Sequence, residues 1–249
     1  EMYAHASLIF LNAEPLIEFP RPTSHKVVDI GGIQTSSHKK LNKEWSDILS
    51  LRPKTVLISF GTVAKSYLMP KEYKETIRQT IKRFTDVTFI WKYEKPEDNI
   101  GDGIANLLVK EWIPQNDMLH DDRLTLFITH CGAGSTMEAT IAGVPLVVIP
   151  VMGDQRRNAQ VVKRTGTGVI LEKSQLEKAN DLENAIREVL DNESYRKTAK
   201  RTARMIASRP FSPRELFVRN MEFLTEFGPL DNLQHYGRHL NFFQFYSLD

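Results

Sequence analysis

The chain has 249 residues, with 33 Lys and Arg against 31 Asp and Glu, a formal net charge of +2 and a single cysteine, Cys131. Such a small and evenly spread charge argues against binding to nucleic acid, and one cysteine excludes an internal disulfide framework. No apolar run approaches the roughly 18 residues of a membrane span, and zinc-type Cys/His spacing is missing, so we expect the chain as given to be soluble.

Short apolar runs alternate with amphipathic stretches along the chain. The apolar runs predict strands at 7–12, 26–32, 54–62, 87–93, 106–114, 124–130, 145–150 and 168–171. The amphipathic stretches predict helices at 70–84, 114–119, 135–142 and 154–164, followed by a helix-rich region from about 181 to 226. Because strands separated by helices form parallel sheets covered on both faces, the pattern predicts one α/β domain with a Rossmann-like parallel sheet and helices on both faces.

The stretch "FITHCGAGSTMEATIAG" joins a strand to a helix through a cluster of glycines. In parallel sheets, ligands bind beside the carboxyl ends of the strands. Here the strand would end at His130, Gly132 and Gly134 would allow close approach of the backbone, and Ser135 would cap the helix. The N–H groups at the helix start suit a phosphate, and Glu138 would suit two ribose hydroxyls. Taken alone, these residues fit a structural turn better than a ligand site.

Two neighbouring strand ends carry further candidate ligand groups. Trp112 and Gln115 follow one strand, where an indole can stack on a planar base and an amide can read its edge. Asp154, Gln155 and Asn158 follow another, where donors and acceptors suit sugar hydroxyls. The structural alternatives are a core tryptophan and an ordinary helix cap. Taken together, the three strand ends match the parts of a nucleotide-sugar.

The ordered motifs from 112 to 159, W-I-P-Q, F-I-T-H-x-G-x-G-S-x-x-E, G-V-P and D-Q-x-x-N-A, resemble the signature of the UDP-glycosyltransferases. The likeness is greatest to the animal membrane-bound branch that includes the UDP-glucuronosyltransferases. It extends upstream through "FPRPTSHKVVDIGGIQ" and "VLISFGTVA" and downstream to "FFQFYSLD". The resemblance implies the C-terminal, donor-binding half of a two-domain GT-B glycosyltransferase.

For the nucleotide, the resemblance assigns the uracil to Trp112 and Gln115 and the ribose to Glu138. It assigns the diphosphate to His130 together with the backbone amides around Gly132 to Ser135, which include Gly134.

For the rest of the donor, the resemblance assigns the sugar to Asp154 and Gln155, with Asn158 in the same motif. Ser59 and Thr62, in "SFGT", would approach the phosphate from another strand end. The donor is a UDP-sugar, whether UDP-glucose or UDP-glucuronate, and is a substrate. No cofactor and no metal are expected.

Three departures from the family pattern stand out. Cys131 occupies a position where the family usually has Gly, and Gly134 one where Asn is common. Asp121 and Asp122 stand where the family often has His-Pro. Gly134 can offer only backbone groups, so a side-chain donor near the phosphate or ribose is missing.

The mechanism implied by the resemblance is an inverting displacement in which a histidine supported by an aspartate deprotonates an acceptor hydroxyl. These two residues belong to the N-terminal half, so no catalytic residue is expected in this chain, and the fragment alone should be inactive. His130 and the helix N-terminus would stabilise the charge on the leaving diphosphate. The acceptor would be a small lipophilic molecule held through the missing half.

The resemblance also predicts the domain organisation and the location. Residues 1–230 would form the UDP-sugar-binding domain, and 231–249 a tail that packs on the missing acceptor domain and precedes a membrane span. The whole enzyme would lie in the endoplasmic reticulum membrane, on the lumenal side. The four aromatics within "HLNFFQFYSLD" make self-association possible.

Two other function classes compete with this interpretation. An NAD-dependent oxidoreductase would carry a glycine fingerprint after its first strand, which "GGIQTSS" does not match. A non-catalytic nucleotide-sugar-binding or scaffolding protein, which keeps the pocket without an acceptor half, stays open as an alternative.

Overall fold

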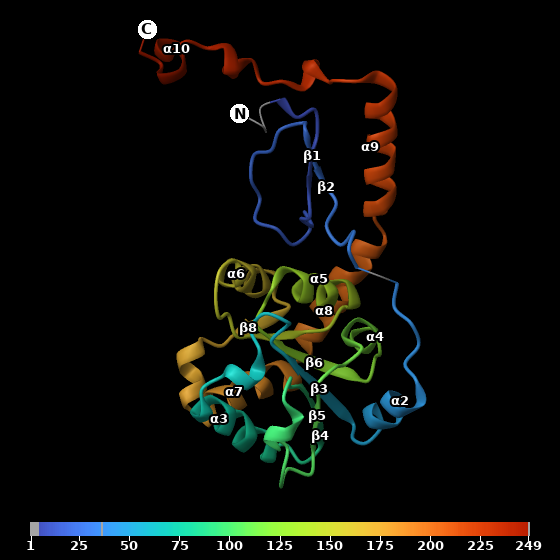
Figure 1. Ribbon diagram of the computed structural model, residues 1–249, viewed down its shortest axis with the longest axis vertical. Helices are drawn as coiled ribbons and strands as arrows, with labels where there is room; N and C mark the ends of the chain where they lie inside the picture. Colours follow the sequence, from blue (N-terminus) through green and yellow to red (C-terminus); the bar gives the residue numbers. More distant parts are fainter. Residues whose placement is uncertain (1–4, 36, 249) are drawn as a thin grey trace. The chain divides into compact units, whose positions relative to one another are not determined.

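A computed structural model describes residues 5–35 and 37–248 of the chain (Figure 1). The chain divides into two compact units. The smaller unit combines Glu1–Ile33 with Pro210–Asp249, and the larger unit is Gln34–Arg209. The sequence predicts a different division, after residue 230, between the UDP-sugar-binding domain and a tail that packs on an acceptor domain. That division stays a prediction.

The larger unit contains a six-stranded sheet in which every neighbouring pair is parallel, in the order β5-β4-β3-β6-β7-β8. Within this sheet the chain first forms β3, then β4 and β5 on one side of it, and then returns to place β6 on the other side of β3. The switch point of the topology therefore lies between β3 and β6, where ligands bind in open α/β sheets. The strands are β3 (Lys54–Ser59), β4 (Val87–Lys92), β5 (Leu107–Lys110), β6 (Leu124–Thr129), β7 (Leu146–Val148) and β8 (Gly168–Ile170).

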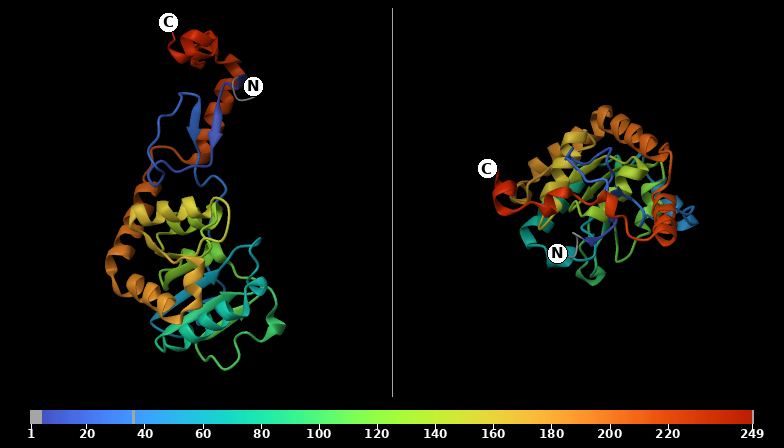
Figure 2. Two further views of the ribbon diagram at one scale, coloured as in Figure 1. Left: turned by 90° about the vertical axis from the view of Figure 1, so that its left-hand side faces the viewer. Right: turned by 90° about the horizontal axis from the view of Figure 1, so that it is seen from above.

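Side chains alternate across this sheet and build one core on each face. Val56 and Ile58 of β3 belong to the first core, whereas Leu57 between them belongs to the second. Both faces are therefore covered by helices (Figures 1 and 2), which explains why the strands read as continuous apolar runs.

Each core is closed by its own helices. The first takes its helical side chains from α3 (Lys71–Lys82) and α7 (Ala179–Asp191). The second takes them from α2 (Lys43–Leu49), α4 (Gln115–Leu119), α5 (Ala133–Ala142) and α6 (Gln155–Thr165), and α8 (Glu193–Ala207) packs on α5. Short 3₁₀ segments are η1 (Ser66–Leu68), η2 (Pro96–Asp98) and η3 (Lys173–Glu177).

The helix α2 was not predicted from the sequence. Asn42 caps it by accepting a hydrogen bond from the Trp45 backbone N–H at 3.0 Å, and Trp45 and Leu49 are its buried residues. A seven-residue helix with two buried side chains is too short for a periodic apolar pattern to mark it.

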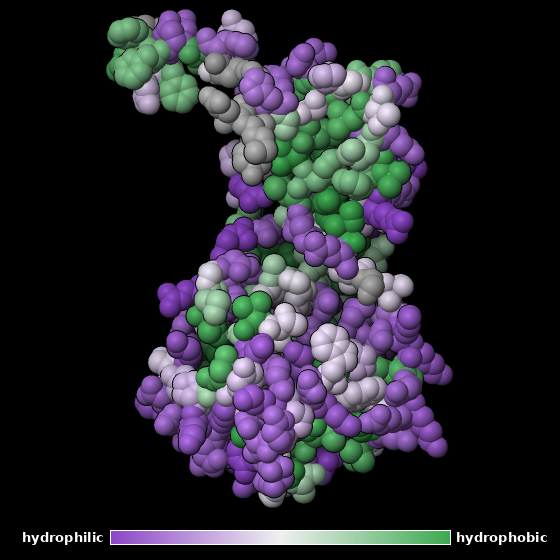
Figure 3. All heavy atoms as spheres, viewed as in Figure 1, coloured by the Kyte–Doolittle hydropathy of each residue, from purple (hydrophilic) through white to green (hydrophobic). Residues whose placement is uncertain are grey.

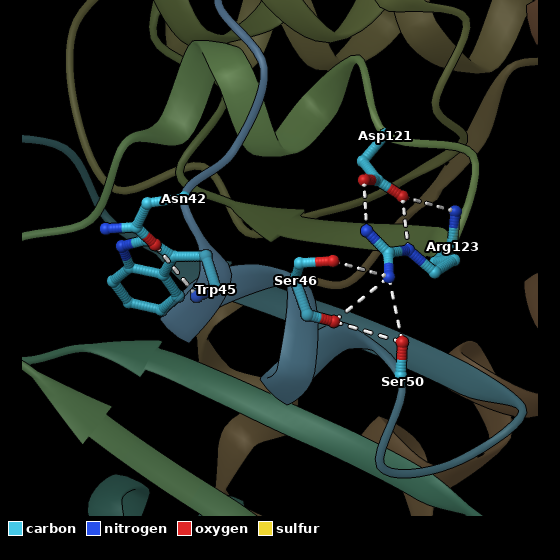
Figure 4. Close-up of polar contacts among 6 residues, drawn as sticks. All are labelled: Asn42, Trp45, Ser46, Ser50, Asp121 and Arg123. Carbon is cyan, nitrogen blue, oxygen red and sulfur yellow. Dashed lines mark hydrogen bonds and ion pairs between the residues drawn. The ribbon is translucent and has the colours of Figure 1, made fainter.

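Arg123, at the start of β6, joins α2 to the sheet (Figure 4). Its guanidinium donates to both carboxylate oxygens of Asp121, at 2.8 and 2.7 Å. It also donates to the Ser46 carbonyl at 3.0 Å and the Ser50 hydroxyl at 2.8 Å. The hydrogen bonds from Arg123 to Asp121 hold the pKa of this carboxyl below its usual value, despite the opposing effect of burial. The forked guanidinium thus binds the end of α2 and the turn before β6 at once.

The smaller unit brings together segments from the two ends of the chain. Its parallel strands β1 (Ile9–Leu11) and β2 (Val27–Asp29) pair with each other and form a separate sheet, which corrects the prediction of one continuous series. The ring of Phe10 packs edge-on against Phe217 of α9 (Pro213–Phe227), with centroids 4.8 Å apart. Gly31 lies so close to the backbone of Ala13 that a Cβ there would be 2.4 Å from its carbonyl oxygen.

The C-terminal segment of this unit consists of η4 (Asp231–Leu233), η5 (Tyr236–His239) and α10 (Phe242–Tyr246). The aromatic side chains of α10 are 59–64% exposed and pack against one another. Figure 3 shows a broad hydrophobic area on the smaller unit. Leu16, Met221 and Phe223 of this unit have exposed side chains. Within the described ranges, every helix falls short of the length and hydropathy that a bilayer crossing requires.

Candidate functional site

A cavity of about 730 Å³ opens at the switch point, beside the carboxyl ends of β3 and β6. Such a volume lies within the usual range for small-molecule sites. Nine of the twelve residues predicted as donor ligands line it: Ser59, Thr62, Trp112, Gln115, His130, Gly132, Gly134, Ser135 and Glu138. The sheet topology therefore brings together groups that are up to 79 positions apart in the sequence.

The imidazole of His130 is held between two glycines. A Cβ added to Gly61 would lie 2.7 Å from Cε1 of the ring, and one added to Gly132 would lie 2.6 Å from Nε2. Gly61 also has a φ of +85°, which other residues rarely adopt. Both glycines are therefore needed to leave room for the ring, which lies between the loops that follow β3 and β6.

Burial lowers the pKa of His130, and the positive charge of Lys92 lowers it further, while Asp154 acts in the opposite direction. The neutral imidazole is therefore favoured in the ligand-free protein. Nδ1 of the ring lies 3.3 Å from the Thr129 hydroxyl. A phosphate close to the ring would favour the charged form, so the group is poised to respond to an anion.

The helix α5 starts in this cavity with Gly132 as its N-cap, and no side chain caps it. The prediction that Ser135 is the cap was wrong, because the helix begins at Ala133 and places Ser135 within its first turn. Nothing lies within 4 Å of a Cβ built on Gly134, so the first turn is open to the cavity. Backbone N–H groups without a side-chain cap suit an anion.

Glu138 lies one turn further along α5 and pairs with Gln115. The Gln115 amide donates to a Glu138 carboxylate oxygen at 2.6 Å and lies 3.5 Å from the Ser135 hydroxyl. These three groups form a polar wall on one side of the cavity. A ligand that uses both Gln115 and Glu138 would enter next to this pair or exchange with it.

Trp112 covers the outer side of the cavity with 72% of its surface exposed. An indole in the core would be buried, so the alternative of a core tryptophan is contradicted. The Lys92 ammonium lies 5.7 Å from the centre of the ring. One face of a large aromatic ring is thus available for stacking.

Lys92 is a site residue that sequence reasoning missed. It ends β4, is 7% exposed, and lines the cavity. Its ammonium donates to the Gly61 carbonyl at 2.7 Å and lies 3.6 Å from a Glu94 carboxylate oxygen. Its position directly after the apolar run of β4 could have indicated a site residue. A buried lysine at the carboxyl end of a parallel strand requires a partner or a ligand.

Residues before α2 also line the cavity and were not predicted. Ser37 and Lys39 face it, and the Lys39 backbone N–H donates to an Asp117 carboxylate oxygen at 2.7 Å. Asn116 and Asp117 complete this rim. These contacts join segments 78 positions apart, so no local sequence pattern could indicate them.

Three predicted sugar ligands lie outside the cavity lining, at the start of α6. The Gln155 side-chain oxygen accepts from the backbone N–H groups of Val151 and Met152, at 2.8 and 3.0 Å. Asn158 donates to the Asp154 carboxylate at 2.7 Å and to the Cys131 carbonyl at 3.1 Å. Gln155 and Asn158 therefore shape the loops, and Asp154 remains exposed. Their role toward a sugar stays a prediction.

Acidic side chains in the site are dispersed. Among the residues that the structure describes, no three His, Cys, Asp or Glu side chains gather closely enough to hold a metal ion. The chemistry that the cavity offers is an aromatic face, a carboxylate-amide pair, a helix N-terminus, an imidazole and a buried ammonium. Such a set can bind a base, a polyol and an anion in one ligand.

Comparison with known proteins identifies the family. The model of the family described as "UDP-glucoronosyl and UDP-glucosyl transferase" matches residues 1–249. This chain belongs to the UDP-glycosyltransferases. The putative UDP-glucuronosyltransferase ugt-48 of Caenorhabditis elegans is 36% identical over 98% of this chain and 47% of its own length. UDP-glucuronosyltransferase 1A7 of Mus musculus is 30% identical over 100% of this chain and 46% of its own.

Solved structures give the same result for the fold. A UDP-glucosyltransferase from Polygonum tinctorium aligns with a TM-score of 0.72 at 20% identity, over 90% of this chain and 55% of that one. Os79 from O. sativa aligns with a TM-score of 0.60 at 26% identity, over 75% of this chain and 45% of that one. The chain spans about half the length of the curated relatives it matches.

The structure shows the surroundings of two departures from the UDP-glycosyltransferase pattern. Cys131 has a φ of +65°, which is the conformation that glycine adopts most easily, and its buried thiol lies 3.4 Å from the Thr136 hydroxyl. Burial raises the pKa of this thiol to about 11. Asp121 is paired with Arg123, and Asp122 with Lys200 at 2.8 Å, so both acids serve the fold.

Proposed function

We propose that this chain is the donor-binding half of an inverting UDP-glycosyltransferase that transfers glucose or glucuronate from a UDP-sugar to a hydroxyl of a small lipophilic acceptor. The acceptor oxygen attacks the anomeric carbon, and the bond from that carbon to the diphosphate oxygen breaks, so that UDP leaves with the electron pair. The hydroxyl proton goes to a base supplied by the half of the enzyme that precedes this chain.

The observation that carries the proposal is the imidazole of His130, fixed between two glycines next to the open N-terminus of α5. This arrangement presents hydrogen-bond donors to a diphosphate before the reaction begins, so negative charge that develops on the leaving group meets groups already in position. Lys92 adds a buried positive charge on the same side of the cavity.

The family resemblance assigns the remaining parts of the donor to other groups in and beside the cavity. The exposed face of Trp112 would stack on the uracil, and Gln115 would read its edge. Glu138 would accept hydrogen bonds from the ribose. Ser59, which ends β3, and Thr62, in the loop after it, would contact the phosphates, and the exposed Asp154 would meet the sugar.

Related enzymes support the donor and the type of acceptor. Os79 from O. sativa has been solved in complex with UDP and deoxynivalenol-3-glucoside, at 25% identity to this chain, and with U2F and a trichothecene. The mammalian and nematode relatives are named UDP-glucuronosyltransferases. Attachment to the endoplasmic reticulum membrane on the lumenal side, as the family resemblance implies, belongs to the same proposal.

Calorimetric titration of the chain with UDP and with uridine tests this function. Both ligands should bind, and UDP should bind more tightly because only it reaches His130. The variant His130→Ala should weaken UDP much more than uridine, whereas Glu138→Ala should weaken both, since both contain the ribose. Glu193→Ala, on the exposed surface of α8, is the control and should change neither affinity. Absence of UDP binding, or equal losses for both ligands in His130→Ala, would contradict the proposal.

A further inference from the structure

A second pocket of about 350 Å³ lies on the larger unit, at the same edge of the sheet as the donor cavity. We call it the lateral pocket. It is bounded by the loop after β3, by η1 and the start of α3, by the loop after β7, and by η3. Its floor consists of the buried side chains of Phe60, Ile149 and Leu176. A preformed apolar floor of this size suits a small organic molecule.

The mouth of the lateral pocket is also apolar, although it faces water. Val63 is 80% exposed, Leu68 68% and Met152 51%. Lys65 and Lys173 stand at the rim, where their aliphatic stems extend the apolar wall and their ammonium groups remain in solvent. Grouped apolar side chains around a hollow mark a binding surface more often than isolated ones do.

The lateral pocket and the donor cavity share a wall. Val63, in the loop after β3, lines both. On the other side, Met152 lines the lateral pocket two positions before Asp154, the residue proposed to meet the donor sugar. A molecule in the lateral pocket would therefore lie beside the donor cavity and, if Asp154 meets the sugar as proposed, beside the donor sugar.

We infer that the lateral pocket is a subsite for the apolar part of the acceptor, a lipophilic phenol or alcohol, which the donor-binding half contributes itself. This inference rests on the proposed function. It differs from the expectation that the acceptor is held through the missing half alone. The shared Val63 wall would let an acceptor hydroxyl reach the donor sugar while its ring system remains in the lateral pocket.

Binding of 1-naphthol to the chain, followed by its fluorescence, tests the inference with a matched pair of variants. Leu68→Asp places a carboxylate at the mouth of the lateral pocket and should weaken 1-naphthol binding by about tenfold or more, since an apolar ligand would then desolvate the charge. Leu51→Asp is the control. Leu51 is 63% exposed, comes before β3 at the opposite edge of the sheet, and should leave the affinity unchanged.

A second variant keeps the test independent of the charge. Ala64→Leu fills part of the pocket and should also weaken 1-naphthol, with an unchanged unfolding midpoint as evidence that the protein is folded. Saturating UDP should not displace 1-naphthol, because the two ligands occupy different pockets. Equal effects of the two aspartate variants, or displacement of 1-naphthol by UDP, would overturn the inference.

Calorimetry with UDP on the same samples separates this inference from the proposed function. Wild-type protein that binds UDP and does not bind 1-naphthol would contradict the lateral subsite alone. Wild-type protein that fails to bind UDP would contradict the proposed function, whatever 1-naphthol does. UDP affinity should be the same in Leu68→Asp and Leu51→Asp, since neither residue lines the donor cavity.

Discussion

The side chain of Trp112 is large and apolar, yet most of its surface faces solvent beside the donor cavity. If its free face stacks on uracil, Trp112→Ala should weaken UDP binding by about 1–3 kcal/mol, the usual range for stacking of a base on an aromatic ring. Trp112→Phe, which retains an aromatic ring, should lose less of the UDP-binding free energy. Calorimetric titration with UDP measures both variants, and an unchanged affinity in folded Trp112→Ala would remove the indole from the site.

Two glycines in the same turn should respond in opposite ways to alanine. Gly132→Ala forces a Cβ to within 2.6 Å of the His130 ring and should lower the free energy of unfolding by about 1–3 kcal/mol, as overpacking does. Gly134→Ala has open space around it within α5 and should keep or raise stability by up to about 1 kcal/mol. Urea unfolding of the pair compares them directly, and a Gly132→Ala protein as stable as the wild type would refute the close packing.

The lowered pKa of His130 makes stability depend on pH in a defined direction. Between the native pKa and about 6.5, the ordinary value, the unfolded chain binds a proton that the native state excludes. The free energy of unfolding should therefore fall as pH decreases below about 6.5, by up to about 1.4 kcal/mol per pH unit from this group. His130→Gln lacks this contribution, so wild type should lose more stability than the variant between pH 7 and pH 5 in chemical denaturation. If the free energy of unfolding fell equally with pH in the wild type and in His130→Gln, the native state would not hold the pKa of the His130 ring below its ordinary value.

Among the elements, α2 is joined to the turn before β6 by the hydrogen bonds of Arg123, in addition to the packing of Trp45 and Leu49 in the core. Arg123→Ala removes hydrogen bonds to Asp121, Ser46 and Ser50 together, and we expect a loss of about 1–3 kcal/mol in the free energy of unfolding. Arg123→Lys keeps the positive charge but loses the two-pronged guanidinium geometry, so it should lose less of the free energy of unfolding than Arg123→Ala. Lys197→Ala, which breaks an exposed pair on α8, is the control and should have no measurable effect in urea unfolding. An Arg123→Ala protein with the same free energy of unfolding as the wild type would show that these hydrogen bonds do not stabilise the fold.

Elements that are buried on both sides could be predicted from the sequence, and the less regular ones could not. The inner strands β3, β4, β6 and β7 were recognised because burial on two faces makes them continuous apolar runs. The edge strands β5 and β8 are only partly buried and were recognised from short apolar runs. The separate pairing of β1 with β2 was missed, because an isolated apolar run does not say which sheet it joins. The helix α2 has only Trp45 and Leu49 buried, which is too few for a periodic pattern.

The same distinction holds for the site. The groups around His130 were predicted because a strand end, glycines and a helix start follow one another in the sequence. Lys39 was missed because only folding brings its loop to the cavity, whereas Lys92 was overlooked although it directly follows an apolar run. Gln155 was predicted as a sugar ligand, whereas its side-chain oxygen bonds the loop after β7, a contact that no motif distinguishes from ligand binding.

For the molecule as a whole, the two units differ in how completely they bury their apolar side chains. Both core clusters of the six-stranded sheet lie entirely within residues 34–209. The smaller unit instead exposes Phe211, Met221 and Phe223, and the aromatic side chains of α10. Because the curated relatives are about twice as long as this chain, we propose that the missing half covers this apolar surface in the complete enzyme.

Separating the two units should therefore separate UDP binding, which belongs to the larger unit, from self-association, which belongs to the smaller one. A protein of residues 34–209 should fold cooperatively and bind UDP with the affinity of the full chain, because the donor cavity and both cores are retained. The full chain should self-associate as its concentration rises, whereas residues 34–209 should remain monomeric, as sedimentation velocity would measure.

Deletion of α8 as well provides the control for this separation. A protein that ends at residue 191 loses Ala199 and Ala203, which are buried residues of the helix that packs on α5, so it should be less stable and bind UDP more weakly. If residues 34–209 alone failed to fold, the smaller unit would be part of the stability of the donor-binding domain. If they folded and self-associated as strongly as the full chain, the apolar surface responsible would lie on the larger unit, around the exposed mouth of the lateral pocket.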